Sequence, residues 1–305
     1  MWILINLLIL MVMVLIGVAF LTLLERKILG YIQDRKGPNK IFLFGLFQPF
    51  SDALKLLSKE WFFFNYSNLY IYSPMMMFFL SLVMWILYPW INCLYNLEFS
   101  ILFMLLVLGL SVYPVLFVGW ISNCNYAILG SMRLVSTMIS FEINLFFLMF
   151  SLMMLIESFS FSDFVFYQNK IKFAILVYPL YLMMFTSMLI ELNRTPFDLI
   201  EGESELVSGF NIEYHSSMFV LIFLSEYMNI MFMSMILSVM FYGFLYWSIK
   251  FILIYLFHMC LIIWIRGILP RIRYDKLMYM CWTEMLMLVM IYLMYLFYIK
   301  EIIVI

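Results

Sequence analysis

Six carboxylic acids fall within 23 consecutive positions of the chain, in the stretch 191–214, which reads ELNRTPFDLIEGESELVSGFNIEY and contains a single base, Arg194. These acids are Glu191, Asp198, Glu201, Glu203, Glu205 and Glu213. Only 11% of the residues in this protein are charged, and these acids alternate with apolar residues, so some carboxylates must lie against apolar surface. Carboxyl groups crowded in this way titrate as a coupled set and exchange protons together. The stretch therefore predicts proton-handling chemistry, whereas its simpler alternative is a solvated acidic loop.

Two further acids, Glu142 and Glu226, lie inside long apolar runs. If these runs begin near Met132 and Ser216, each acid is ten residues in, which is about 15 Å along a helix. An ionised carboxylate facing lipid at that depth costs about 3 kcal/mol or more, so both should face the interior of a helix bundle. Polar neighbours support this placement: Ser136, Thr137, Ser140, Asn144, Ser225 and Asn229. We expect both acids to belong to a proton relay; the alternative is an interhelical hydrogen bond from a protonated Glu.

The composition requires that these acids be positioned by membrane helices. Hydrophobic residues make up 67% of the chain and the mean hydropathy is +1.07, which is typical of an all-α polytopic membrane protein. We predict one integral membrane domain over residues 1–305 with eight spans. They lie at about 2–24, 74–91, 99–121, 133–157, 172–192, 217–240, 247–265 and 279–299. The first run lacks a basic segment before it, so it is expected to be a retained span and not a cleaved signal.

The connections between these spans fall on two faces. One face, called the loop side below, comprises about 25–73, 122–132, 193–216 and 266–278, and it carries thirteen of the seventeen Lys and Arg residues. The positive-inside rule places this face on the side where the protein is synthesised. Within 48–60 the apolar and charged residues occupy opposite faces of a helix, which predicts an interfacial helix with residues 61–64 as its aromatic anchor.

Several shorter sequence patterns give further predictions, most of them for the loop side. Pro196 after Thr195 favours the start of a short helix. The bases of 266–276 could pair with the acids of 191–214 or with a docked subunit, although topology alone would explain them. The four cysteines and two histidines show no ligand spacing, so we expect no metal, haem or iron–sulfur site in this chain, and nothing favours nucleic-acid binding.

Six segments carry more specific motifs, in this order: LTLLERKILGYIQDRKGPNK, GLFQPFSDALKLLSKE, GWISNCNYAILGSMR, ELNRTPFDLIEGESELVSGFNIEY, LSEYMNIM and IRGILPRIRYDKLM. In the order and spacing of these segments, the chain resembles a known family from about Leu21 to Trp282. This is the mitochondrially encoded subunit 1 family of respiratory complex I, NADH:ubiquinone oxidoreductase, which also has bacterial counterparts. Thr137 stands where relatives tend to have Gln, Phe141 where they have Tyr, and Ile268 where Thr is common.

The resemblance implies a subunit at the foot of a hydrophilic arm that admits ubiquinone to a cavity and couples its reduction to proton pumping. It implies an acidic relay formed by Glu142, Glu191, Asp198, Glu201, Glu203, Glu205, Glu213 and Glu226. It implies bases near the quinone cavity or paired with the loop at Arg26, Arg35, Arg194 and Arg273. FMN and iron–sulfur clusters are expected on partner subunits of the hydrophilic arm, with further partners in the membrane arm.

The same resemblance implies a multi-pass protein of the mitochondrial inner membrane, surrounded by lipid, with its loop side in the matrix and both termini on the intermembrane-space side. Two alternatives stay open. One is the equivalent subunit of a hydrogenase-type complex. The other is an ion-coupled transporter, which the lack of a detectable internal repeat disfavours. No lysine occupies a mid-span position, so we expect a carboxylate relay and not a complete pump.

Overall fold

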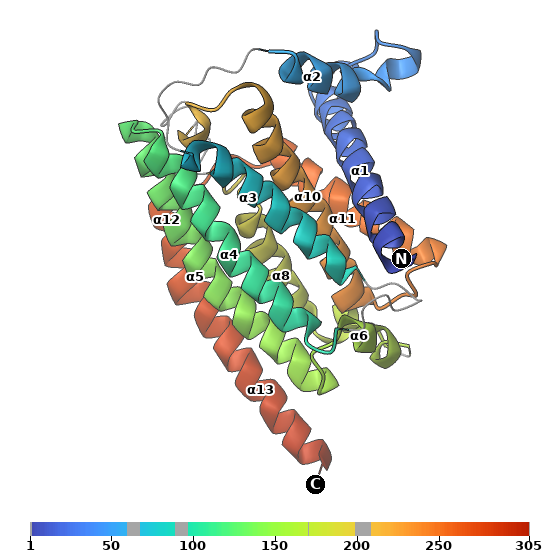
Figure 1. The fold of residues 1–305 in the computed structure, drawn as a ribbon. Coiled ribbons are helices and arrows are strands. Elements are labelled where there is room, and N and C mark those ends of the chain that lie inside the picture. Colours follow the sequence, from blue (N-terminus) through green and yellow to red (C-terminus); the bar gives the residue numbers. More distant parts are fainter. Residues whose placement is uncertain (1, 60–67, 89–96, 170, 199–208, 305) are drawn as a thin grey trace.

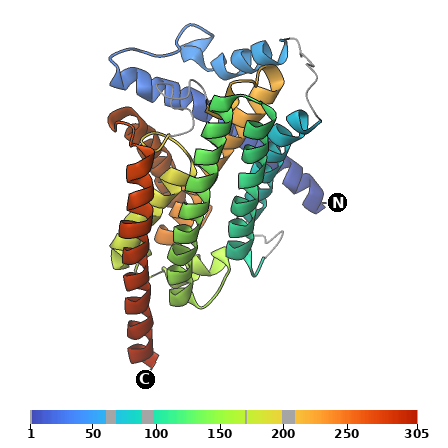
Figure 2. The same ribbon diagram turned by 90° about the vertical axis from the view of Figure 1, so that its left-hand side faces the viewer.

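The protein is a bundle of long helices, seen from two directions in Figures 1 and 2. The computed structural model describes residues 2–59, 68–88, 97–169, 171–198 and 209–304. The long helices are α1 (Trp2–Ile32), α3 (Leu69–Met84), α4 (Ser100–Ile121), α5 (Asn125–Ile156), α10 (Ser216–Tyr242), α11 (Ile249–Ile268) and α13 (Leu286–Val304). Shorter ones are α2 (Gln48–Leu57), α6 (Phe161–Tyr167), α7 (Phe173–Leu176), α8 (Tyr178–Glu191) and α12 (Tyr274–Tyr279). Single turns are η1 (Leu43–Gly45), η2 (Trp85–Leu87), η3 (Gly209–Asn211) and η4 (Met280–Met285).

Seven helices in the described ranges are long and apolar enough to cross a membrane, which confirms the predicted all-α polytopic class. They correspond to seven of the eight predicted spans, the last running continuously over Tyr274–Ile302. In Figure 1 the N-terminus lies at the end of α1 that points away from α2, and the C-terminus lies at the far end of α13. Helix α5 packs against α4, α8 and α13, while α10 packs against α3, α11 and α1.

The predicted span 172–192 differs from the prediction because it is broken. Helix α7 ends at Leu176, the backbone leaves helical geometry at Val177, and α8 then begins with Tyr178 and Pro179. Its 14 residues extend about 21 Å, less than the roughly 30 Å of a bilayer core. Helix α8 packs against α5, α7 and α10 with Leu180 and Met184 fully buried, while Leu176 and Tyr178 beside the break are exposed. The backbone at the break is satisfied locally, because the Val177 amide donates to the Phe173 carbonyl at 2.9 Å and the Val177 carbonyl accepts from the Tyr181 amide at 3.2 Å.

Hydroxyl side chains inside the spans bond back to their own helix. In α10 the hydroxyls of Ser225, Ser234 and Ser238 donate to carbonyls three residues earlier at 2.6–2.7 Å, and all three serines are buried. In this way each hydroxyl has a hydrogen-bond partner within its own apolar helix. Large side chains such as Phe141 and Phe232 fill the space between the helices.

The last span contains one turn of different geometry. Residues Met280–Met285 form a π-helical turn between α12 and α13. The turn presents Cys281 to α5, where the Asn144 amide donates to the Cys281 carbonyl at 3.3 Å and to its Sγ at 3.0 Å. Beyond it, α13 continues past the rest of the bundle (Figure 1), and Lys300 near its end pairs with Glu157 at 2.7 Å.

The predicted interfacial helix is present as α2, which crosses the loop-side end of α1 (Figure 1). Pro49 stands in its first turn, where a proline is well tolerated. Asp52 on its polar face pairs with Arg26 of α1, while Leu54 and Leu57 on the apolar face are exposed. An exposed apolar face is what a helix lying on a membrane surface presents to lipid. The predicted aromatic anchor at 61–64 lies outside the described residues.

The prediction that a helix begins at Pro196 is wrong for the described residues of that segment. Positions 195–198 form a turn, in which the Phe197 amide donates to the Arg194 carbonyl at 2.8 Å and the Thr195–Pro196 peptide is cis. The Pro196 carbonyl instead accepts a hydrogen bond from the Ile272 amide at 2.9 Å. This contact across the loop side, not a local helix, fixes the segment.

Candidate functional site

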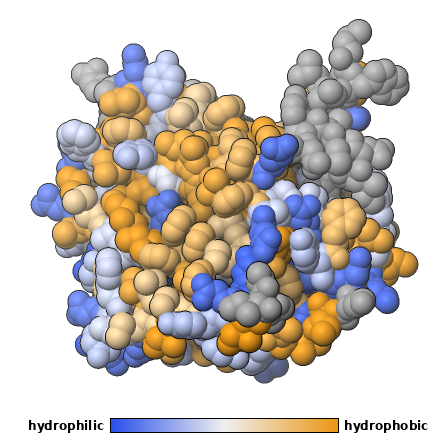
Figure 3. Space-filling model, turned by 90° about the horizontal axis from the view of Figure 1, so that it is seen from below, coloured by the Kyte–Doolittle hydropathy of each residue, from blue (hydrophilic) through white to orange (hydrophobic). Residues whose placement is uncertain are grey.

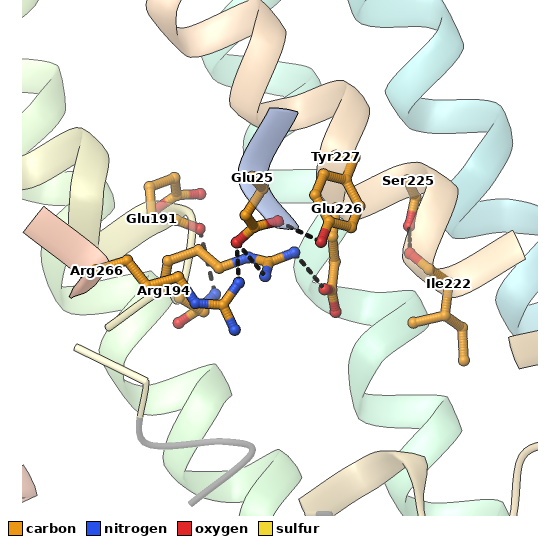
Figure 4. A network of polar contacts seen from close by, with 9 residues as sticks. Glu25, Glu191, Arg194, Ile222, Ser225, Glu226, Tyr227 and Arg266 are labelled. Carbon is orange, nitrogen blue, oxygen red and sulfur yellow. Dashed lines mark hydrogen bonds and ion pairs between the residues drawn. The ribbon is translucent and has the colours of Figure 1, made fainter. Parts of the chain in front are cut away.

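A buried network of charged groups joins four separate parts of the chain below the loop side (Figure 4). Glu25 comes from α1, Arg194 from the segment after α8, Glu226 and Tyr227 from α10, and Arg266 from α11. We call these five residues the ion cluster. Glu25 is 6% exposed and Arg194 7% exposed, although either charge would be better solvated at the surface. The helices therefore hold these charged side chains together at one site inside the bundle.

Glu25 is the acceptor at the centre of the ion cluster. It accepts the Tyr227 hydroxyl at 2.5 Å, forms an ion pair with Arg266, and lies 3.9 Å from Arg194 Nη1. The other nitrogen, Arg194 Nη2, lies 3.4 Å from Glu226 Oε2, and the guanidinium stacks over the Tyr227 ring at 4.6 Å from its centroid. Two arginines and two glutamates are formally neutral together, which lets them share a buried site.

Arg194 reaches this site because of how α8 ends. Asn193, which follows the helix, has a φ of +50°, a left-handed conformation that asparagine adopts more readily than most residues. Its side-chain amide donates back to the Glu191 carbonyl at 3.2 Å. The chain turns there, and Arg194 points back into the bundle (Figure 4).

A cavity with mostly apolar walls and a few polar residues adjoins the ion cluster. Its volume is about 70 Å³, and its lining includes Glu191, Arg194, Ser225, Glu226 and Asn229. A water molecule needs about 30 Å³, so the cavity has room for about two. Glu191 is 7% exposed, and its Oε2 is buried without a hydrogen-bond partner in the described part of the chain. The cavity thus provides a place where water can connect Glu191 with Glu226.

Glu142 lies on the other side of Glu191. It stands 17 residues after the start of α5, not ten, because that helix begins at Asn125. Its carboxyl lies against Gly109 of α4, where an added Cβ would come within 2.6 Å of Glu142 Oε1. The charge of Glu142 acts on Glu191, so the two carboxyls are within electrostatic reach. The carboxyl therefore faces a neighbouring helix inside the bundle.

The predicted pairing between bases of 266–276 and acids of 191–214 is present at one pair. Arg271 Nη2 lies 3.2 Å from Asp198 Oδ2, and Asp198 is 6% exposed. The Thr195 hydroxyl also lies 3.5 Å from the Arg266 carbonyl. These contacts tie the acidic stretch to the end of α11, from which Arg266 enters the ion cluster.

Other predicted site residues lie outside the ion cluster. Arg26 pairs with Asp52, Arg35 donates to the Gln33 side chain at 3.0 Å, and Arg273 is an exposed residue that precedes α12. Glu213 lies before α10, and its carbonyl accepts the Tyr70 hydroxyl at 2.9 Å. Glu201, Glu203 and Glu205 lie outside the described residues. Of the four predicted bases, only Arg194 is buried in the ion cluster.

The sequence predictions omitted Glu25, Tyr227 and the pairing of Arg266. One signal could have identified Glu25, since it is the only acid in the 31 residues of α1. No comparable signal marks Tyr227, because the chain contains 21 tyrosines. In the described ranges, no group of three or more His, Cys, Asp and Glu residues could hold a metal ion.

Comparison with known proteins places the chain in a family. Residues 5–297 match the family model described as NADH dehydrogenase. The chain is 90% identical over 301 residues to "NADH-ubiquinone oxidoreductase chain 1" of Apis mellifera ligustica, covering 99% of each sequence. It is 50% identical to the Aedes aegypti protein of that name, over 96% of this chain and 94% of the other, and 44% identical to the Papio hamadryas protein, over 95% and 94%. The chain therefore belongs to the NADH-ubiquinone oxidoreductase chain 1 family, that is, to the subunit 1 family of complex I, a multi-pass membrane component that works with the other subunits of that complex.

Proposed function

We propose that this subunit forms a passage by which ubiquinone reaches its site of reduction, and that its acids form a path coupling that reduction to proton translocation. In this proposal the domain is embedded in the mitochondrial inner membrane as one unit. The loop side faces the matrix, where a hydrophilic arm carrying FMN and iron–sulfur clusters docks. The termini face the intermembrane space.

The ion cluster is the observation that carries the proposal. Arg194 stands between two carboxylates, 3.9 Å from Glu25 and 3.4 Å from Glu226, and neither distance is that of a close charge-assisted hydrogen bond. The guanidinium of Arg194 is thus shared between the two acids. Reduction of a quinone on the loop side creates negative charge, and such a charge would draw the arginines and shift protons among the acids.

The acidic path is proposed to run from the loop to the interior of the bundle. Asp198 and Arg271 lie at its loop end, and Glu226, the 70 Å³ cavity, Glu191 and Glu142 follow. Water in the cavity would complete the hydrogen-bonded connection. Glu201, Glu203, Glu205 and Glu213 are proposed to sense the charge of the quinone. Arg26, Arg35 and Arg273, which lie on the loop side, are proposed to hold the entrance or the quinone head group.

The test replaces Glu191 by Gln in the intact complex, because Gln keeps the shape and removes the proton-carrying group. Positioned proton transfer contributes about 10²–10⁴ to a rate, so we expect coupled ubiquinone reduction and proton translocation to fall by about 100-fold. Oxidation of NADH by an artificial electron acceptor should be unchanged, since that chemistry needs no quinone.

Glu157→Gln is the matched control, because Glu157 is an acid whose side chain is 65% exposed and pairs with Lys300 away from the ion cluster. Equal proton translocation by the two variants would exclude Glu191 from the path. Loss of NADH oxidation together with quinone reduction would indicate failed assembly. Glu203→Gln, measured in the same way, tests the acids that lie outside the described residues.

A further inference from the structure

A second cavity opens far from the ion cluster, between α1, α10 and α11. Its volume is about 460 Å³, and it lies in the half of the bundle that holds the chain termini. Met13 of α1, Met235 of α10 and Tyr255 of α11 line its sides, and Trp247 lines it where α10 connects to α11. None of the residues that line it is charged. Cavities of this size commonly hold an apolar ligand of substantial length.

Two lysines lie at the connection between α10 and α11, where Tyr246 and Trp247 line this cavity. Lys172 Nζ lies 4.1 Å from the centre of the Phe244 ring, which belongs to that connection, and donates to the Gln168 carbonyl at 2.9 Å. Gln168 is itself fully buried, and its amide donates to the Met240 carbonyl at 2.5 Å. Lys250 is exposed in the first turn of α11, directly after the connection. The fold therefore holds Lys172 against the connection that leads to Lys250.

This arrangement is electrostatically unfavourable as it stands. Within the described ranges, neither lysine forms an ion pair with a carboxylate. Lys172 precedes α7 and lies outside the long apolar helices, and burial together with the charge of Lys250 lowers its pKa. An anion between the two ammonium groups would relieve both effects. The two ammonium groups therefore favour a negatively charged ligand, and the adjoining cavity favours an apolar one.

We propose that Lys172 and Lys250 bind the phosphate of an anionic phospholipid, and that one of its acyl chains occupies the cavity between α1, α10 and α11. Lys250 directly precedes Phe251, which lines the cavity, so the head-group site and the chain site are continuous. Tyr246 and Trp247 line the same end, and such amphipathic rings are typical of the head-group level of a membrane. Figure 3 views this end of the molecule, where hydrophilic side chains lie among apolar surface. The proposal is independent of the quinone and proton roles.

The experiment uses the intact complex in phosphatidylcholine vesicles that contain a trace of lipid with a photoactivatable acyl chain. The probe is either phosphatidylglycerol or phosphatidylcholine with the same chain, and cross-linked peptides are identified by mass spectrometry. A basic residue at a membrane surface favours an anionic lipid by about fivefold. We expect phosphatidylglycerol to label the peptides that contain Met235, Trp247 or Tyr255 about 25-fold more than phosphatidylcholine.

Variants assign the preference to the lysines. Lys172→Gln and Lys250→Gln should each lower it about fivefold, whereas Lys300→Gln, at the same end of the molecule but paired with Glu157, should leave it unchanged. Because Lys250 is exposed, its variant and the wild-type comparison of the two lipids remain informative if Lys172→Gln fails to assemble.

Three results would overturn the proposal. Equal labelling by the two lipids would mean that the cavity takes a neutral ligand. A preference that survives both lysine replacements would place the anion elsewhere. Binding of inorganic phosphate to the two lysines without any labelling of the cavity peptides by phosphatidylglycerol would mean that the lysines hold a free anion and not a lipid head group.

Discussion

The ion cluster predicts that Arg194 and Glu226 depend on each other energetically. Their side chains are 8% and 23% exposed, and the charged atoms lie 3.4 Å apart. Two unit charges at that distance attract by about 5 kcal/mol at an effective dielectric constant of 20. Loss of one partner of a buried pair costs about 3–5 kcal/mol, and the partial exposure of Glu226 places the expected cost near 3 kcal/mol.

Glu226→Gln therefore leaves two arginines to share the single charge of Glu25, and Arg194→Gln leaves two glutamates with Arg266 alone. Each variant should destabilise the local structure by about 3 kcal/mol, which corresponds to about 100-fold faster exchange of protected amides. In the double variant the cluster is neutral again, so its cost should be well below the sum of the two single costs.

Hydrogen–deuterium exchange with mass spectrometry on the assembled complex measures this, in peptides covering 190–198 and 216–230. Peptides from 286–302 serve as the internal control, because α13 packs mainly against α5 and η4, which carry no residue of the ion cluster. Exchange that changes by less than threefold in both single variants would refute the coupling. So would a double variant whose effect equals the sum of the two.

Two smaller changes probe neighbouring contacts. Tyr227→Phe keeps the ring under Arg194 but removes the hydroxyl that donates to Glu25 at 2.5 Å. Because hydrogen bonds to charged groups contribute about 1.5–3 kcal/mol, the rate of amide exchange near Glu25 should rise at least about tenfold. Gly109→Ala should displace the Glu142 carboxyl at a cost of about 0.5–1.5 kcal/mol and lower the number of protons translocated per electron. Gly17→Ala is the control, because its added Cβ meets other atoms only at 3.4 Å or more, and it should leave that number unchanged. Equal proton yields in the two variants would contradict the placement of Glu142.

The architecture was predictable because apolar length and charge asymmetry are local properties of the sequence. Seven of the predicted spans are confirmed as long helices, and a helix is confirmed at 48–57 within the predicted 48–60, while its position at the membrane surface stays a prediction. The span 172–192 was predicted as continuous because most of its residues are apolar, but the pieces on either side of the break at Val177 pack against α5 and α10, which are far away in the sequence. The turn at Pro196 differs from the predicted helix for the same reason, since its carbonyl bonds to Ile272 far along the chain.

The site was predictable only in part. Acids inside apolar runs stand out, so Glu142, Glu191 and Glu226 could be named from the sequence, and the structure brings Glu191 and Glu226 to one cavity. Glu25 looked like a residue of the loop side because it adjoins Arg26 and Lys27, yet it faces inward to Arg266. That pairing spans 241 positions, and no pattern along the chain records a contact at such a separation.

The π-helical turn at Met280–Met285 lets the last span hold one extra residue without changing the direction in which α13 faces. A π-turn holds one residue more than the α-helical turn it replaces, so a one-residue deletion in this turn would convert it to α-helix and leave the orientation of α13 nearly unchanged. Lys300 would then still pair with Glu157 and donate to the Met154 carbonyl. The same deletion beyond Leu286, in regular α-helix, would rotate the following residues by about 100° and turn Lys300 away from α5. Substitutions can accumulate along α13, where much of the surface is exposed, but its length between Leu286 and Lys300 must stay constant for both ends to keep their contacts.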